Sequence, residues 1–255
     1  MMRNVTMVFL ALALAVSAAS AASPCGPDAV VAGPVCLDRY EATVWKVPNP
    51  TTTNASLVTK IKLGTATRAD LTAGGATRVV ARDECSRIGQ NCANDIFAVS
   101  LASEFPSGLI TWFQAQEACV NAGKRLPTSA EWQMGADGTP DPGPDNRATD
   151  CNSASGTASI TGARSACVSA RGAFDMVGNL TEWVTDWLPL SPTCASWGGV
   201  SNDEMCLAGA SETNTTPGAV LRGGSFNDGS LAGPLSVGDV PPAASSTVIG
   251  FRCAR

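Results

Sequence analysis

The stretch GAFDMVGNLTEWVTDW, residues 172–187, holds the side chains best suited to chemistry. Asp175 and Glu182 stand seven positions apart, with the turn-forming pair Gly178-Asn179 between them. Two carboxylates so placed could work as an acid and a base, or could ligate a hard cation through oxygen. They could also lie at an ordinary turn and on a solvated face. Nothing in the sequence places them in a cleft with raised pKa values, which disfavours catalysis and leaves the metal loop and the ordinary turn open.

The chain contains no histidine. This excludes Ser-His-Asp and Cys-His catalysis, histidine general bases and iron sites built on two histidines and a carboxylate. The formal net charge is -5, and no basic patch interleaved with aromatic residues indicates a nucleic-acid partner. Any chemistry must therefore come from carboxylates, cysteines, hydroxyl groups and the backbone.

The first 21 residues are typical of a secretory signal peptide. A single basic residue, Arg3, precedes a short apolar run that ends in Ala19-Ser20-Ala21, a cleavage site made of small residues. The run is too short to span a bilayer comfortably, and no second one follows it. We therefore expect a secreted or periplasmic protein without a transmembrane segment, and a mature chain that begins at residue 22.

Cysteine is abundant, with ten residues that all lie beyond the expected cleavage site. An even count in an exported chain indicates disulfides, and the absence of any C-x-x-C spacing disfavours zinc. Cys25 and Cys36 bracket one short turn-rich segment, and Cys85 and Cys92 bracket another. We expect both of these pairs to be bonded.

Two helices are predicted near the middle of the chain by their capping residues. Thr111 and Gln114 form a capping box that opens a helix ending at Gly123, and Thr128 with Glu131 opens a second, short helix. In the first helix the apolar residues recur on one face, so that face, which includes a cysteine, is expected to point into a core. The residues of this face are Trp112, Ala115, Cys119 and Ala122.

The remaining segments are expected to be short or irregular. Residues 37–45, LDRYEATVW, alternate well enough for one strand, and residues 49–80 are Thr-rich and weakly patterned, which predicts an exposed insertion or a ragged hairpin. Residues 188–217 are predicted to form a surface loop pinned by its own two cysteines. The end of the chain predicts a short strand, a glycine turn, a long loop and a final strand. We therefore expect one α+β domain over residues 22–255.

Four motifs in sequence order carry a resemblance to a known family. GKRLPTSAEW, FDMVGNLTEW, VLRGGSF and GFRCAR occur in the order and spacing of the formylglycine-generating enzyme, or sulfatase-modifying factor, family. DRYEATVW is similar to the family's first strand. The resemblance implies a C-type-lectin-like α+β fold with few helices, short twisted strands and much irregular chain tied down by disulfides and calcium.

The resemblance also implies an activity, the copper-dependent oxidation of a sulfatase cysteine to formylglycine. Family members hold copper(I) with two cysteines after RGGSF, because copper(I) prefers thiolates. The matching positions here are Asp228 and Gly233, so the expected copper ligands are missing. Cys194 and Cys206 could replace them, although a structural disulfide is the more ordinary role for such a pair. The family's second branch uses an iron held by histidines and is excluded by their absence.

In the family, the segment that matches FDMVGNLTEW binds calcium. The matching ligands are Asp175, Gly178, Leu180 and Glu182, the glycine and the leucine through their carbonyl oxygens. Calcium accepts such a mixture of carboxylate and carbonyl oxygens.

Two further features are carried over from the family in the same way. A second calcium site would use Asn152 and the backbone of Ser153. Cys119 and Cys253 match a pair of cysteines that family members join in a disulfide.

Two functions from different classes follow. The first is an exported, calcium-stabilised binding domain without oxidase activity, whose loops around residues 227–246 contact a protein or a glycan. The alternative is a formylglycine-generating oxidase with relocated copper thiols. The number of free thiols distinguishes the two, because copper binding by cysteine requires thiolates that a disulfide lacks.

Overall fold

A computed structural model describes residues 24–92, 95–141, 145–211 and 215–255. The predicted signal peptide lies outside the described residues. All the elements are short. The longest helix, α4, has 10 residues, and the longest strand, β6, has 9. The α-helices are α1 (Ala55–Leu63), α2 (Arg68–Ala73), α3 (Ala81–Glu84), α4 (Trp112–Asn121) and α5 (Ser129–Ala136), and the two 3₁₀ helices are η1 (Leu207–Gly209) and η2 (Gly229–Leu231).

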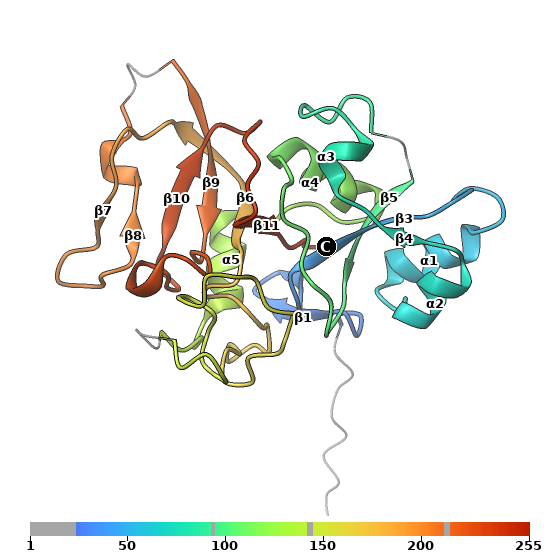
Figure 1. The fold of residues 1–255 in the computed structure, drawn as a ribbon, viewed down its shortest axis with the longest axis horizontal. Coiled ribbons are helices and arrows are strands. Elements are labelled where there is room, and N and C mark those ends of the chain that lie inside the picture. Colours follow the sequence, from blue (N-terminus) through green and yellow to red (C-terminus); the bar gives the residue numbers. More distant parts are fainter. Residues whose placement is uncertain (1–23, 93–94, 142–144, 212–214) are drawn as a thin grey trace, which may run out of the picture.

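A six-stranded sheet forms one half of the molecule (Figure 1). Its strand order is β11-β6-β9-β10-β8-β7, with parallel pairing of β11 to β6 and of β10 to β8. The strands are β6 (Thr181–Pro189), β7 (Ala195–Ser196), β8 (Glu204–Met205), β9 (Pro217–Arg222), β10 (Val237–Val240) and β11 (Ile249–Phe251). The final strand therefore lies beside β6, which carries Glu182.

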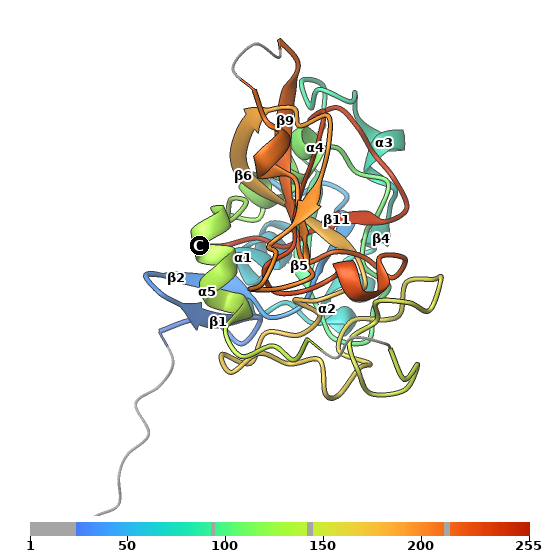
Figure 2. The same ribbon diagram turned by 90° about the vertical axis from the view of Figure 1, so that its left-hand side faces the viewer.

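Two smaller sheets make up the other half. In one, β3 lies between β4 and β5, and in the other β1 and β2 form an antiparallel hairpin. The strands are β1 (Ala29–Ala32), β2 (Val35–Asp38), β3 (Ala42–Lys46), β4 (Thr77–Arg78) and β5 (Ile96–Ser100). The irregular chain between α5 and β6 gathers at one end of the molecule, as both views show (Figures 1 and 2).

The largest core joins the two halves. One cluster contains fully buried residues from both halves. They are Trp183 and Phe251 from the large sheet, Val44 and Ile96 from the sheet of β3, β4 and β5, and Ala118 from α4. A second cluster lies around α5 and includes the buried side chains of Leu37, Trp132, Met176 and Val220. Elements that are distant in sequence thus bury their apolar side chains in the same core. This common core stabilises strands that would be too short to be stable alone.

Both predicted helices are confirmed. Thr111 and Gln114 form the reciprocal capping box of α4, and Thr128 and Glu131 form that of α5. Of the predicted buried face of α4, Ala115, Cys119 and Ala122 are fully buried, and Trp112 is half-buried.

The prediction for residues 49–80 is wrong. Instead of an exposed insertion or a ragged hairpin, the segment forms α1, α2 and the short strand β4, and it contributes Leu57, Ile61 and Leu71 to the main core. Thr67 and Asp70 form a third capping box at the start of α2. The many threonines hid this pattern, because they lie on the exposed side while a few scattered apolar residues carry the packing.

Two predicted strand boundaries also differ. Residues 37–45 are not one strand, since β2 ends at Asp38 and β3 begins at Ala42. The backbone breaks there as Glu41 turns its carboxylate into the interior, where it is fully buried. Residues 227–246 are not loop throughout, because they contain η2 and β10.

All ten cysteines are paired in five disulfides. The predicted pairs Cys25–Cys36, Cys85–Cys92 and Cys119–Cys253 are present, and so is the pair between Cys194 and Cys206. The fifth, Cys151–Cys167, closes the irregular chain before β6. Within the described ranges no helix combines the length and the apolar character that a bilayer span requires.

We predict that Cys119–Cys253 contributes most to stability among these bonds, because its residues are 134 positions apart. Replacing both cysteines with alanine should lower the free energy of unfolding by roughly 4–5 kcal/mol on the chain-entropy estimate. The same change at Cys25 and Cys36, which are 11 positions apart, should cost about 3 kcal/mol or less. Urea unfolding of both variants measures this difference. Mass spectrometry of a non-reduced digest should recover Cys119 and Cys253 in one linked peptide, and their recovery as separate peptides would show that the pairing is wrong.

Candidate functional site: a buried carboxylate cluster and a neighbouring cleft

The two positions that match the copper ligands present no thiol. Asp228 follows the RGGSF turn, and its carboxylate accepts the Ser225 N–H at 2.6 Å. Gly233 packs so closely on Asp203 that a Cβ atom at residue 233 would lie 2.2 Å from the Asp203 carboxylate. Asp203 is itself held by the Leu235 N–H at 2.7 Å. A cysteine at position 233 would thus require the Asp203 side chain to move, which the sequence alone could not indicate.

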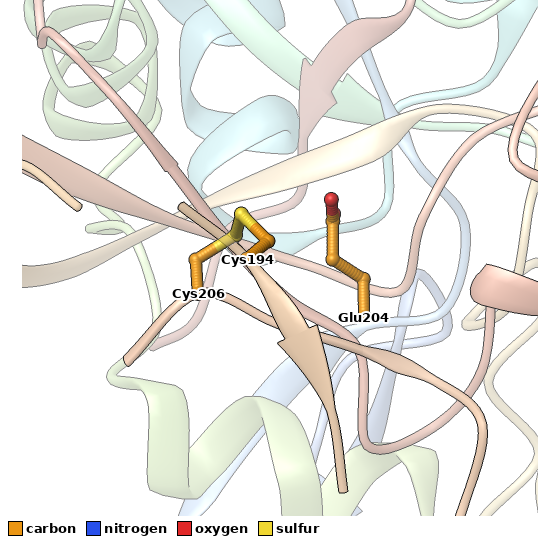
Figure 3. Close-up of side chains that lie close together, drawn as sticks. All are labelled: Cys194, Glu204 and Cys206. Atoms are coloured by element: carbon orange, nitrogen blue, oxygen red, sulfur yellow. A yellow bond between two sulfur atoms is a disulfide. The ribbon is translucent and has the colours of Figure 1, made fainter. Parts of the chain in front are cut away.

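The alternative pair of thiols is a disulfide in this structure. Cys194 and Cys206 are bonded, and Glu204 lies beside them (Figure 3). None of the ten cysteines, all of which fall within the described residues, is free. The oxidised protein therefore offers no thiolate for copper(I).

The four predicted calcium ligands lie at the start of β6 and in the turn before it. Asp175 is 1% exposed, and one of its carboxylate oxygens accepts the Gly162 N–H at 2.7 Å. Its other oxygen, Oδ1, is buried without a hydrogen-bond partner. Gly178 adopts φ +72°, and a Cβ atom there would lie 2.4 Å from the Asn152 carbonyl oxygen, so the turn requires glycine.

Glu182 is held by a different partner. Arg252 donates to both of its carboxylate oxygens at 2.7 Å, and Trp132 Nε1 donates to one of them at 2.8 Å. Both charged residues are at most 1% exposed. Arg252 also donates to the carbonyl oxygens of Asp38 and Phe174. The glutamate thus belongs to a buried ion pair that joins β6 to the C-terminal strand.

Sequence reasoning missed the third carboxylate of this cluster. Glu41 is fully buried, and it accepts hydrogen bonds from the Leu180 N–H at 2.8 Å and from the Asn179 side chain. Burial, and then the charges of Asp175 and Glu182, raise the pKa of Glu41 well above its ordinary value. Its only sequence signal is a charged residue in an otherwise strand-like run.

The cluster is therefore short of positive charge. Glu41, Asp175 and Glu182 share a single paired guanidinium, that of Arg252, while Arg164 is paired with Asp145. Burial is the main reason why the pKa of Asp175 rises to about 6. A carboxylate oxygen without a partner, in a buried region where carboxylates outnumber guanidinium groups although Arg252 and Arg164 both act on Asp175, fits a hard divalent cation. Among the predicted donors, Asp175 keeps an oxygen for such a cation, whereas both carboxylate oxygens of Glu182 accept from Arg252.

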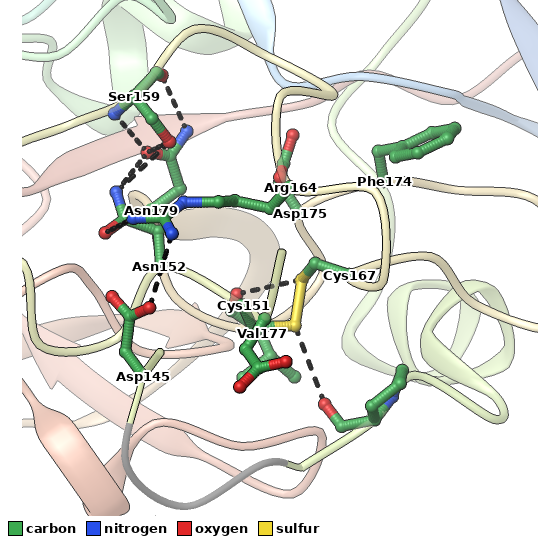
Figure 4. Close-up of a disulfide and its surroundings, with 12 residues drawn as sticks. Asp145, Cys151, Asn152, Ser159, Arg164, Cys167, Phe174, Asp175, Val177 and Asn179 are labelled. Carbon is green, nitrogen blue, oxygen red and sulfur yellow. Dashed lines mark hydrogen bonds and ion pairs between the residues drawn. A yellow bond between two sulfur atoms is a disulfide. The ribbon is translucent and has the colours of Figure 1, made fainter. Parts of the chain in front are cut away.

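The residues of the second predicted calcium site do not fit a metal ion. Asn152 is buried, and its side-chain oxygen accepts from the Arg164 guanidinium at 3.4 Å, while Asp145 faces the same guanidinium at 3.4 Å (Figure 4). The Asn152 amide group donates to the side chain of Asn179 at 3.0 Å. A fixed guanidinium thus already supplies the positive charge beside Asn152, next to the Cys151–Cys167 disulfide.

A cleft of about 460 Å³ opens beside α5, at the edge of the large sheet. Leu235 and Val237 from the C-terminal segment and Trp197 from the disulfide-pinned segment contribute to its walls. Trp197 Nε1 donates to the Leu235 carbonyl oxygen at 2.8 Å, which ties the two segments together. The remaining wall residues are Ser129, Ala130, Gln133, Asp186, Leu207 and Arg222.

Arg222 fixes the floor of this cleft. It is 3% exposed, its guanidinium lies 4.7 Å from the Trp132 ring centroid, and it donates to the Ser236 carbonyl oxygen at 2.6 Å. Burial lowers the pKa of Arg222 to about 10, so the side chain remains charged at neutral pH. The mainly apolar cleft with an arginine and an aspartate in its wall is the kind of concave surface that binds ligands.

Several solved structures resemble the chain at low sequence identity. The Major Tropism Determinant U1 variant matches with a TM-score of 0.48 and 19% identity over 91% of this chain and 53% of its own. The PvdO structure from Pseudomonas aeruginosa matches with a TM-score of 0.41 and 17% identity, covering 87% of this chain and 80% of its own. The chain spans about half the length of the first of these, and neither likeness carries an inference about activity or ligand. No curated protein matches the chain.

The family assignment rests on a match to a family model. The model of the sulfatase-modifying factor enzyme 1-like domain covers residues 48–255, which include the GKRLPT, FDMVGN, RGGSF and GFRCAR motifs, Asp175 and Glu182 of the buried carboxylate cluster, and the cleft. The expected α+β, C-type-lectin-like fold is the fold of this family. The chain therefore belongs to the sulfatase-modifying factor, or formylglycine-generating enzyme, family.

Proposed function

We propose that the protein is an exported, calcium-stabilised binding domain of this family, without the copper-dependent oxidase activity. The observation that carries the proposal is the pair of positions after RGGSF. One holds a carboxylate engaged with the backbone, and the other is a glycine packed against Asp203. Copper(I) binds thiolate far better than carboxylate oxygen. The residues at these two positions therefore cannot hold the copper ion that performs the family's oxidation.

Disulfides support export. Five bonds tie down a domain built of short elements, and such bonds persist in secreted and periplasmic compartments rather than in the cytosol. The predicted signal peptide at residues 1–21 agrees with this.

The cleft beside α5 is the ligand site that the geometry supports best. It is formed in part by the C-terminal segment that the sequence indicated as the binding region, and Trp197 gives it an aromatic surface. Aromatic rings with an apolar body and a hydrogen-bonding edge are common in recognition sites. The partner would be a protein or a glycan that presents apolar surface together with a polar group for Arg222 or Asp186.

We predict that the protein forms no formylglycine. Incubation with a peptide containing Cys-x-Pro-x-Arg, copper(I) and oxygen should leave the cysteine unchanged, because no thiolate pair is present to hold the metal. An aminooxy probe for aldehydes, read by mass spectrometry, measures the product. A copper-active family member under the same conditions is the positive control. Aldehyde formation above that of free copper would overturn the proposal.

We predict that calcium stabilises the folded protein through Asp175. At a calcium concentration about 100 times the dissociation constant, the stabilisation should be about 2.7 kcal/mol. For a domain of this size that is a rise in melting temperature of roughly 5–10 °C over the protein in chelator.

The variant Asp175→Asn isolates this effect. It should abolish the response to calcium, yet be at least as stable as the parent in chelator, because it removes a buried charge beside Glu41 and Glu182. Asp83→Asn is the control, since the Asp83 side chain is 66% exposed and its loss should leave the calcium response intact. A calcium response that survives Asp175→Asn would place the ion elsewhere.

We predict that Trp197→Ala removes ligand binding while the fold is retained. The oxidised protein should be probed against a glycan array and a displayed peptide library, which distinguish the two classes of partner. Specific hits should weaken at least tenfold in Trp197→Ala and be unchanged in Phe105→Ala, which removes an aromatic residue that is 54% exposed and outside the cleft. Hits whose binding is unchanged in Trp197→Ala, or the absence of hits in both libraries, would count against this cleft as the ligand site.

A further inference from the structure

The Cys194–Cys206 disulfide is the most accessible of the five. Cys194 is the only exposed cysteine of the ten, whereas Cys206 is 2% exposed. An attacking thiolate can therefore reach this bond through the Cys194 sulfur, while both sulfurs of Cys119–Cys253 and Cys151–Cys167 are buried. Accessible disulfides are the ones that exchange most readily.

The two cysteines are also held together by contacts that do not depend on the bond between them. Cys194 directly precedes β7 and Cys206 directly follows β8, and these strands pair at Ala195 with Met205 and at Ser196 with Glu204. The Cys206 N–H donates to the Val237 carbonyl oxygen at 2.9 Å, which anchors the segment to β10. After reduction the two thiols would therefore remain next to each other on the edge of the sheet.

A carboxylate completes a ligand set at the same place. A carboxylate oxygen of Glu204 and the two sulfur atoms all lie within 4.8 Å of one another, and Glu204 lies beside the disulfide (Figure 3). The surroundings are anionic, because the charges of Asp228 and Asp239 act on Glu204 and, after burial, contribute to raising its pKa. Such surroundings attract a cation, and among the described residues no ion pair engages Glu204.

We propose that reduction converts Cys194, Cys206 and Glu204 into a binding site for a zinc-like divalent cation. Two thiolates and one carboxylate are a donor set that zinc and cadmium accept, with water at a remaining position. The oxidised protein lacks the site, so metal binding here would report the thiol–disulfide state of the surroundings. The inference goes beyond the proposed binding function and does not depend on it.

The chemistry needs a dithiol reductant. One of its thiolates attacks the Cys194 sulfur, and Cys206 leaves as a thiolate. The second thiol of the reductant then displaces Cys194, so that one protein disulfide becomes two thiols and the reductant becomes a disulfide. Binding of the ion afterwards releases the thiol protons and changes no oxidation state.

Limited treatment of the full chain with dithiothreitol, followed by anaerobic removal of the reductant, tests the proposal. Alkylation and peptide mapping should find Cys194 and Cys206 modified before the other cysteines. Cadmium should then bind one ion per chain, with thiolate-to-metal absorption in the ultraviolet and release of about two protons per ion at pH values below the thiol pKa. A large excess of zinc should compete with it, and the oxidised protein should show none of these signals. Circular dichroism checks that the reduced protein stays folded.

Matched variants assign the ligands. The double variant Cys194→Ser with Cys206→Ser should lose cadmium binding, whereas Cys85→Ser with Cys92→Ser should keep it. Glu204→Gln should weaken binding by at least about tenfold, the loss that removing an outer partner of a ligand already causes, while Glu117→Gln should have no effect. Opening of a different disulfide first, a folded dithiol form that binds no cadmium, or unchanged affinity in Glu204→Gln would each overturn the proposed site.

Discussion

The buried ion pair between Arg252 and Glu182 is the interaction on which the rest of the structure depends. Both side chains are at most 1% exposed, and the same guanidinium donates to backbone carbonyl oxygens of Asp38, Phe174 and Asp175. A buried ion pair adds little net stability over apolar packing, because both charges must be desolvated. Its role here is to satisfy carbonyl groups of irregular chain that no regular strand pairs. It thereby fixes the turn before β6 relative to β2 and β11.

This arrangement also explains the charge deficit beside it. Arg252 is occupied by Glu182, so Glu41 and Asp175 lie in the same low-dielectric region without a paired cation of their own. Glu41 is stabilised by the donors of Asn179 and Leu180, but Asp175 keeps an oxygen without a partner. A buried polar atom of this kind costs free energy unless something satisfies it. At Asn152 the buried side-chain oxygen instead accepts from the Arg164 guanidinium, so the two sides of the turn differ in how their buried oxygens are satisfied.

Sequence reasoning identified features that depend on residues close together in the chain. It missed features that depend on contacts between residues far apart in the chain. The capping boxes at Thr111 and Thr128 predicted both helices, because hydrogen bonds between residues three apart are encoded in those residues alone. Asp175 and Glu182 were found through a motif, whereas Glu41 was not, since its partners Asn179 and Leu180 are nearly 140 positions away. Helix α2 could have been found from the Thr67–Asp70 capping box, whereas α1 has no side-chain cap. Strand β10 could not, because it is stabilised mainly by pairing with β9.

The residues that maintain the fold are thus distinct from the positions that match the family's copper ligands. The residues that organise the fold, Arg252, Glu182 and Cys119–Cys253, lie within the span that matches its family, and each has the partners that its position requires. The position of the second copper ligand is instead closed by packing, because Asp203 fills the space beside Gly233. Restoring a thiol there would require Asp203 to release the Leu235 backbone, which forms part of the cleft. The contact that occupies the space beside Gly233 therefore also holds part of the cleft wall.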